Sequence, residues 1–434
     1  MRSLASGFTT GLLALCLVSS GPAAPLLAAG APHIGWSRQF GTADADEATA
    51  VAVDGSHNVF VGGNTGGDLY GPNAGLWDGF LRKYDYQGAV LWTTQFGTPK
   101  DDEVYDVTTD GSGGAYVVGY TGPLSRPAAH DTDAYVRRYD ASGGLLWAKT
   151  FGTQADDSAL GVAVDRSGNA YVGGRTVGSL FAANAGNADI FLCKYDASNN
   201  LVWGRQVGSA GSDWSQAHCL ALDASGNIYI GGTTRGDLGG PNPNLYRQLF
   251  LIKYTPEGDL AWKKQYAQWS NSSGGSLAAN AAGKIAMTGE WNRALVSRLD
   301  TGGNVEWNTS LNFLGPGVST YGYGVALDAA GGACIACDAD ASGGDNPDVL
   351  ICGLDASGKY LWHLLQSTMY EEEAYDVAVD SWDRIYVVGR TEGSLFGVNP
   401  SPGYTDAFVE VLPEPATLSL LALGALALLG RRRA

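Results

Sequence analysis

The sequence predicts an all-β fold: a seven-bladed β-propeller of four-stranded antiparallel blades, closed by its N-terminal strand and followed by a short C-terminal hydrophobic helix. Tryptophan recurs seven times at a near-constant interval, and strand-length segments rich in Val, Tyr, Phe and Ile alternate with turn residues. Between the two ends, no segment has helical periodicity. The composition agrees, because 62 Gly, 16 Pro and 45% hydrophobic residues suit many short strands joined by tight turns.

The regular tryptophans define the repeat. They follow one another at steps of 56, 55, 56, 59, 45 and 55 residues, an interval typical of propellers and other repeat arrays. The repeats start at Trp36, Trp92, Trp147, Trp203, Trp262, Trp307 and Trp362.

Each repeat contains four strand-like segments. In the third repeat they cover residues 160–165, 170–174, 189–196 and 201–203, and Gly, Asn, Asp or Ser bounds each one. Gly and Asn supply the positive φ that a tight hairpin turn requires. Four short antiparallel strands in each of seven repeats predict a propeller with seven four-stranded blades.

The two ends of the repeat region are out of phase. The first repeat opens with Trp36–Phe40, which corresponds to an outer strand, whereas the last repeat ends at Val411 without one. An open ring would leave two exposed sheet edges, which proteins generally avoid. We therefore expect Trp36–Phe40 to pair with residues 407–412 and close the ring.

These repeats resemble the SBBP family of propeller repeats. Residues 223–232 read Asp-Ala-Ser-Gly-Asn-Ile-Tyr-Ile-Gly-Gly, and residues 189–195 follow the pattern Asp-x-Phe-x-x-Lys-Tyr. The resemblance covers residues 36–412 and implies a fold but no reaction. The fifth repeat departs from it, because it has only 45 residues, and we expect its blade to be small or distorted.

The first 29 residues have the features of a secretory signal peptide. Arg2 provides a positive start, residues 12–18 form a short apolar run, and small residues lead to Ala29. The sequence therefore predicts an exported protein.

The C-terminal 22 residues resemble the PEP-CTERM sorting signal. An apolar stretch over residues 416–430 lies between the triplet Pro413, Glu414, Pro415 and the basic residues Arg431, Arg432, Arg433. Fifteen helical residues span only about 22 Å, short of a hydrocarbon core of about 30 Å, so the anchor is weak. The resemblance implies recognition by an exosortase. We expect the chain to be held on the outer side of the inner membrane before processing, then to reach the cell surface or the extracellular space.

The charge and the cysteines exclude several classes of function. A net charge of −17 disfavours binding to nucleic acid. Cys334 and Cys337 form a Cys-x-x-Cys pair, but their odd spacing on a strand points the side chains to opposite faces. No second pair completes a zinc site, so the sequence offers no confident metal site. None of the five histidines lies in a hydrolase or metalloprotease motif, and we predict a non-enzymatic protein with no catalytic residues.

A row of acidic residues precedes the first strand of most repeats, on the face that carries the long loops. Its members are Asp46, Asp102, Asp157, Asp213 and Glu372. Such recurring residues can belong to the blade itself, with each carboxylate accepting bonds from loop amides. The alternative is a cation or ligand face, since Ca²⁺ takes six to eight oxygen ligands and clustered carboxylates supply them.

The fifth and sixth repeats lack these acids and contain aromatic residues instead. Flat aromatic rings beside polar loops can stack on sugar rings. The members of this possible platform are Trp269, Trp291, Tyr321 and Tyr323, and the alternative is that they repack the shortened blade.

Three functions remain open on the sequence alone. The favoured one is a surface or matrix protein that binds an extracellular partner, either exopolysaccharide or another surface protein, through the long-loop face. The second is a glycan-active lyase or hydrolase on the same scaffold. The third is a purely structural protein of the envelope. A propeller carries many unrelated functions, so the fold does not decide among them.

Overall fold

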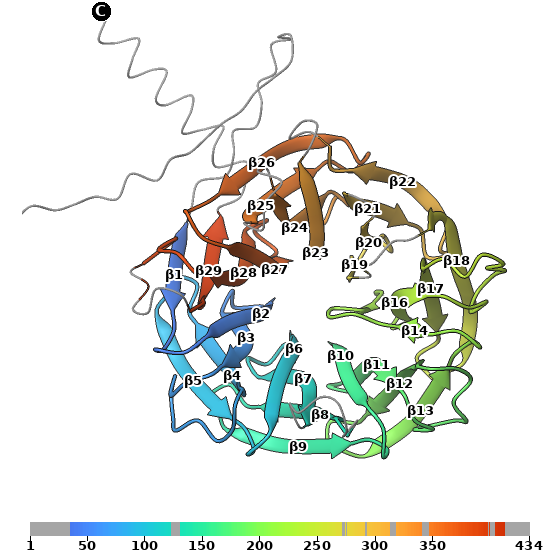
Figure 1. The fold of residues 1–434 in the computed structure, drawn as a ribbon, viewed down its shortest axis with the longest axis horizontal. Helices are drawn as coiled ribbons and strands as arrows, with labels where there is room; N and C mark the ends of the chain where they lie inside the picture. The colour runs from blue at the N-terminus through green and yellow to red at the C-terminus, as the bar shows by residue number, and fades with distance from the viewer. Residues whose placement is uncertain are drawn as a thin grey trace, which may run out of the picture.

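The computed structural model describes residues 35–122, 131–270, 274, 276–290, 293–312, 318–340, 347–397, 399 and 404–412. These residues form seven antiparallel sheets around a central axis, as Figure 1 shows. No helix occurs among the described residues. The predicted propeller is confirmed. The predicted signal peptide over residues 1–29 and the predicted helix over residues 416–430 lie outside the described residues.

Each of the first three blades is a meander of four strands, running from the axis to the rim. Blade 1 contains β2 (Asp46–Val53), β3 (Val59–Thr65), β4 (Asp78–Tyr84) and β5 (Val90–Phe96). Blade 2 contains β6 (Asp101–Thr109), β7 (Ala115–Gly122), β8 (Asp133–Tyr139) and β9 (Leu145–Phe151). Blade 3 contains β10 (Asp157–Val164), β11 (Ala170–Thr176), β12 (Asp189–Tyr195) and β13 (Leu201–Val207).

Blades 4 and 5 are irregular at the axis. In blade 4 the inner strand is split into β14 (Asp213–Trp214) and β15 (Leu220–Leu222), followed by β16 (Ile228–Thr234), β17 (Gln248–Tyr254) and β18 (Leu260–Ser270). Blade 5 contains β19 (Leu277–Ala279), β20 (Ile285–Glu290), β21 (Ala294–Leu299) and β22 (Val305–Ser310). Its inner strand has only three residues, in keeping with the short fifth repeat.

The last two blades complete the ring. Blade 6 contains β23 (Ser319–Leu327), β24 (Ala333–Asp340), β25 (Asp348–Leu354) and β26 (Tyr360–Gln366). Blade 7 contains β27 (Glu372–Val379), β28 (Ile385–Thr391) and β29 (Asp406–Leu412), and its outer strand is β1 (Trp36–Phe40).

The N-terminal strand closes the ring as predicted. β1 pairs antiparallel with β29, with Trp36 opposite Val411 and Phe40 opposite Ala407. Gln39 on β1 donates to Asp406 Oδ2 at 2.8 Å, as Gln95 donates to Asp78 in blade 1 and Gln206 to Asp189 in blade 3. β1 therefore makes the same glutamine–aspartate hydrogen bond to β29 that the outer strands of blades 1 and 3 make to the third strands of their own blades.

The hydrophobic core lies between the blades. Each of seven clusters of buried residues joins two neighbouring blades, and one of them packs Val61 and Phe80 of blade 1 against Val388 and Val409 of blade 7. All five described cysteines are unpaired and buried. Cys334 packs in the cluster between blades 6 and 7, whereas Cys337 packs in the one between blades 5 and 6, so the two point to opposite faces of β24.

Five of the seven regular tryptophans share a contact that helps to explain their spacing. The ring of each of these five lies against a turn glycine of the next blade, so close that a Cβ on Gly143 would stand 2.8 Å from the Trp92 ring. Gly143 also has a φ of 85°, which other residues rarely adopt. The same pairing joins Trp36 to Gly88, Trp203 to Gly258, Trp262 to Gly303 and Trp307 to Gly358.

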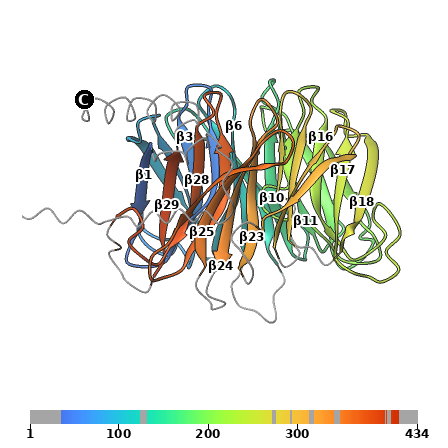
Figure 2. The same cartoon turned by 90° about the horizontal axis from the view of Figure 1, so that it is seen from above.

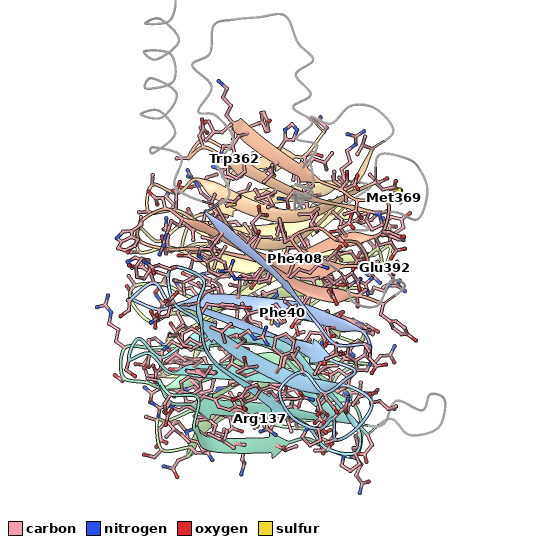
Figure 3. The ribbon with its side chains drawn as sticks, turned by 90° about the vertical axis from the view of Figure 1, so that its left-hand side faces the viewer. Phe40, Arg137, Trp362, Met369, Glu392 and Phe408 are labelled. Atoms are coloured by element: carbon pink, nitrogen blue, oxygen red, sulfur yellow. The ribbon has the colours of Figure 1, made fainter. Side chains whose placement is uncertain are left out.

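The two faces of the ring differ. Loops before the first strand and between the second and third strands of each blade lie on one face, which we call the long-loop face; the opposite, short-turn face carries turns such as residues 54–58 and 85–89. Figure 2 shows the ring from the side. In Figure 3, Met369 and Glu392 lie on the long-loop side, and Trp362 lies toward the other.

Candidate functional site

The row of acidic residues on the long-loop face is buried. Each carboxylate accepts bonds from the backbone N–H and the hydroxyl of the residue four positions earlier; for Asp46 these come from Thr42, at 2.5 and 2.9 Å. Burial raises the pKa of Asp46, and the hydrogen bonds from Thr65 and Thr42 oppose this shift. The same arrangement holds for Asp102 with Thr98, Asp157 with Thr153, Asp213 with Ser209 and Glu372 with Thr368.

These acids thus hold the loop that leads into each inner strand. In blade 6 Thr320 takes the equivalent position, and its Oγ1 accepts from the Ala294 N–H at 2.9 Å. Among the described residues, no three His, Cys, Asp or Glu side chains gather so as to hold a metal ion. Binding of Ca²⁺ at this row, the alternative to a structural role, stays untested.

A second set of carboxylates lines the axis just inside the long-loop face. Glu47, Glu103 and Glu373 follow the buried acids of blades 1, 2 and 7. Tyr120 OH donates to Glu103 Oε1 at 2.7 Å, and Arg390 Nε lies 2.8 Å from Glu373 Oε2. Burial raises the pKa of Glu47, and the Glu103 and Glu373 carboxylates add to this.

His218 lies near the axis of the ring, a position that no sequence motif indicates. Between β14 and β15 the chain leaves the blade, and the His218 side chain reaches blades 1, 2 and 7. Its Nδ1 lies 3.1 Å from Asp106 Oδ1 in blade 2 and 3.6 Å from Asp376 Oδ2 in blade 7, and its Nε2 lies 3.1 Å from the Thr49 carbonyl oxygen in blade 1.

The backbone of His218 extends this link. Its N–H donates to the Leu160 carbonyl of blade 3, and its carbonyl accepts from the Leu277 N–H of blade 5. One residue of blade 4 thus contacts five other blades. Burial disfavours the charged imidazole, but the Asp376 and Asp106 carboxylates outweigh it and raise the pKa of His218 to about 9. The imidazole is therefore a cation at neutral pH.

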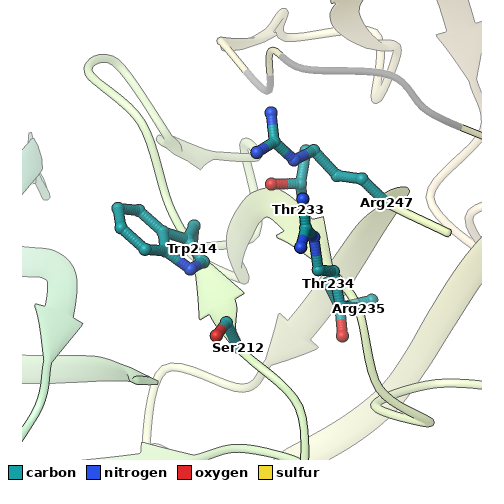
Figure 4. Close-up of a pocket in the computed structure, with 6 residues that line it drawn as sticks. All are labelled: Ser212, Trp214, Thr233, Thr234, Arg235 and Arg247. Carbon is teal, nitrogen blue, oxygen red and sulfur yellow. The ribbon is translucent and has the colours of Figure 1, made fainter. Parts of the chain in front are cut away.

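A pocket of about 190 Å³ opens on the long-loop face of blade 4. Trp214 lies on one side of it, and Arg235 and Arg247 lie on the other (Figure 4). Trp214 is 46% exposed, and Arg175 Cζ lies 4.6 Å from the centroid of its ring. Ser212, Thr233 and Thr234 complete the lining with hydroxyl groups.

The sheet register brings these residues together. Asp213 and Trp214 pair with Thr234 and Thr233, and Thr234 pairs with Gln248, the residue after Arg247. Arg235 and Arg247 are both exposed, and neither forms an ion pair within the part of the chain that the structure describes. A wider hollow of about 610 Å³ over blade 1 is lined by neither aromatic nor basic side chains.

The structure describes the side chains of only two of the four predicted platform residues, so the platform stays a prediction. Tyr321 and Tyr323 are exposed on β23, and Tyr323 contacts the Tyr375 ring edge-to-face, with centroids 5.8 Å apart. Trp269 lies on β18, but its side chain is outside the described part of the structure, as is the whole of Trp291. The exposed Trp214 was not among the predicted residues.

The predicted sorting signal follows the last strand directly. Pro413, Glu414, Pro415 and Arg431, Arg432, Arg433 all lie outside the described residues, and β29 ends at Leu412. Within the described ranges, no helix is long and apolar enough to cross a membrane.

Comparison with known proteins agrees with this organisation. The SBBP family, a β-propeller repeat, matches residues 35–71, 91–122, 146–182 and 202–239. The PEP-CTERM protein-sorting motif matches residues 411–433. This motif supports export through the exosortase system and membrane anchoring before processing.

Two kinds of relative show how far the likeness extends. The regulatory protein FlaEY of Caulobacter vibrioides (strain ATCC 19089 / CIP 103742 / CB 15) is 26% identical over 217 residues, which cover 46% of this chain and only 22% of the relative. Two structures of the polysaccharide lyase PL25 ulvan lyase, one of them bound to -[GlcA(1-4)Rha3S]-, have a TM-score of 0.51 at 11% identity. Each alignment covers 87% of this chain and 96% of the lyase. At that identity the likeness shows the fold alone.

The ring closed by β1, the tryptophan–glycine contact repeated between blades and the two sequence matches lead to one conclusion. The chain is a seven-bladed β-propeller whose first four repeats match the SBBP β-propeller repeat, and it carries a PEP-CTERM sorting motif, which supports export.

Proposed function

We propose that this protein is a non-enzymatic surface or matrix protein that binds an acidic exopolysaccharide in the Trp214 pocket. The observation that carries the proposal is one exposed tryptophan facing two unpaired arginines on a rigid sheet. A guanidinium group binds carboxylate or sulfate through paired hydrogen bonds, and an indole ring stacks on the apolar face of a sugar. Threonine and serine hydroxyls supply the further polar contacts that a sugar needs.

The charge of the whole chain makes this pocket selective. With a net charge of −17, most of the surface repels a polyanion. Binding then depends on the place where Arg235, Arg247 and Arg175 gather. The ulvan lyase offers a precedent for an acidic sugar on a propeller, since its structure is bound to -[GlcA(1-4)Rha3S]-.

The test compares a polymer of glucuronic acid with a neutral glucan of the same length. We expect the purified protein to retain the acidic polymer and not the neutral one. Replacing Arg235 and Arg247 together with Gln should weaken binding at least about 30-fold, because each charge-assisted bond contributes about 1–3 kcal/mol and two are lost. Trp214→Ala should weaken it by a similar factor.

Arg166→Gln is the matched control, because Arg166 is also exposed but lies in a turn of the short-turn face. Binding that is unchanged in the Arg235/Arg247 variant, or lowered equally by Arg166→Gln, would contradict the proposal.

The same incubation separates the alternatives. A binding protein leaves the length of the polymer unchanged, whereas a glycan-active lyase or hydrolase shortens it. A purely structural envelope protein, or one whose partner is another surface protein, retains neither polymer. Size-exclusion analysis of the polymer after overnight incubation distinguishes these results.

A further inference from the structure

A group of exposed residues lies on the short-turn face where blades 7 and 1 meet. Trp382 is 50% exposed and Tyr86 is 47% exposed. Arg384 joins them, because its Nη1 donates to the Tyr86 carbonyl at 3.4 Å and its Cζ lies 4.6 Å from the centroid of the Trp382 ring. His57 stacks on the Trp382 ring, with centroids 3.4 Å apart. We call Tyr86, Trp382, Arg384 and the neighbouring Val90 and Leu91 the exit patch.

The last strand of the ring ends beside the exit patch. Val411 pairs with Trp36, whose Nε1 donates to the same Tyr86 carbonyl at 3.2 Å. Leu412 pairs with Ile385 as Tyr84 pairs with Val59 in blade 1, so β29 ends where the third strand of the other blades reaches the short-turn face. The chain therefore leaves the propeller at the short-turn face.

The segment that joins Leu412 to the apolar stretch is short. Only residues 413–415 separate Leu412 from the apolar stretch over residues 416–430. Three extended residues span at most about 11 Å. While the tail is in the membrane, the short-turn face of blades 7 and 1 is held within this distance of the lipid.

We propose that the exit patch rests on the outer surface of the inner membrane while the tail is inserted. Tryptophan and tyrosine favour the membrane–water interface, where the ring lies in the apolar region and the polar group stays in water. Val90 and Leu91, both about half exposed, add apolar area. Arg384 is ion-paired with Asp380, at 2.8 Å, and holds the Trp382 ring and the Tyr86 backbone in place. The net charge of −17 disfavours adsorption to anionic lipid, so the contact depends on the tail.

This orientation has a direct consequence for the other face. With the short-turn face on the lipid, the Trp214 pocket points away from the membrane. The inference rests on anchoring by the tail and stands whether or not the pocket binds a polysaccharide.

Spin labels on the full exported chain, reconstituted in vesicles of phosphatidylethanolamine and phosphatidylglycerol, test the proposal. Trp382→Cys and Tyr86→Cys place labels in the exit patch, and Tyr246→Cys is the control, because Tyr246 is 49% exposed on the long-loop face. The five described cysteines are buried, so they do not compete for the label.

On reconstitution, we expect the labels at 382 and 86 to collide several-fold less with a water-soluble nickel complex and more with oxygen, whereas the label at 246 does not change. Thermal melting before labelling identifies any variant that fails to fold, and the second patch position then decides. Equal access of the nickel complex to positions 382, 86 and 246 in vesicles would overturn the proposal.

Discussion

Gln39 and Asp406 lie 367 positions apart in the chain, and Gln39 Nε2 donates to Asp406 Oδ2 at 2.8 Å where the ring closes. The same amide donates to the Gly393 carbonyl, and its oxygen accepts from the Phe396 and Gly397 N–H groups. The side chain of Gln39 thus joins β1 both to the strand beside it and to the long loop between β28 and β29.

Gln39→Ala should destabilise the whole ring by about 1–3 kcal/mol, because it leaves partly buried donors and acceptors without partners. Deleting residues 30–41 removes the closing strand, and we expect a larger loss of stability. Urea denaturation followed by tryptophan fluorescence measures both effects. Unfolding midpoints equal to that of the parent protein would show that β1 does not hold the ring closed.

Gly143→Ala should destabilise the protein by about 1–3 kcal/mol, because the new methyl group meets the Trp92 ring and the backbone has a positive φ. Gly55→Ala is the control, since no atom lies within 4 Å of its Cβ position. Its effect should stay within about 0.5 kcal/mol. Equal melting temperatures for the two variants would contradict the role given to the tryptophan–glycine contact.

The stability of the protein should fall as the pH rises from about 6.5 toward 9. The folded-state pKa of His218 is raised from 6.5 to about 9 by the Asp376 and Asp106 carboxylates, so the native state binds this proton more tightly than the unfolded state. The stabilisation is complete below pH 6.5 and is lost as the pH passes 9.

His218→Asn tests this dependence, because Asn tolerates the positive φ of 57° at this position. The variant should be less stable at pH 7, and its melting temperature should change less between pH 6.5 and 9.5. Parallel curves for the two proteins would show that His218 makes no contribution of this kind.

The melting temperature should not change when EDTA is added. The carboxylates of Asp46, Asp102, Asp157, Asp213 and Glu372 are already bound by N–H and hydroxyl groups of their own loops. Differential scanning calorimetry with and without EDTA measures this. A lower melting temperature that Ca²⁺ restores would instead establish a cation at this row or elsewhere in the molecule.

The features that repeat could be predicted from the sequence. A tryptophan at each outer strand, glycines in the turns and the missing outer strand of the last repeat all follow from contacts that recur in blade after blade. The partner of Trp36–Phe40 could be predicted because the first repeat opens with an extra outer strand and the last repeat lacks one. The third strand of the last repeat is therefore the edge that this strand can cover.

The features that occur once could not be predicted in this way. His218 contacts Asp106, 112 positions away in the sequence, and Thr49, 169 positions away. Neither contact recurs in another repeat, so the repeat pattern could not predict it. Residues 215–219 do lack the alternating apolar pattern of the other inner strands, which was the available signal. Trp214 and Arg247 meet because β14 and β17 both flank β16, and Arg247 lies in a variable loop without a counterpart in other repeats.

The pairing of β1 with β29 also sets the order of assembly during export. The strand that waits longest for a partner is the first to emerge, and its partner is the last one made before the tail. Blade 7 cannot be completed until β29, the last strand before the tail, is available to pair with β1 and β28. Up to that moment the edge of β1 is open to pairing with other chains, which is a route to aggregation.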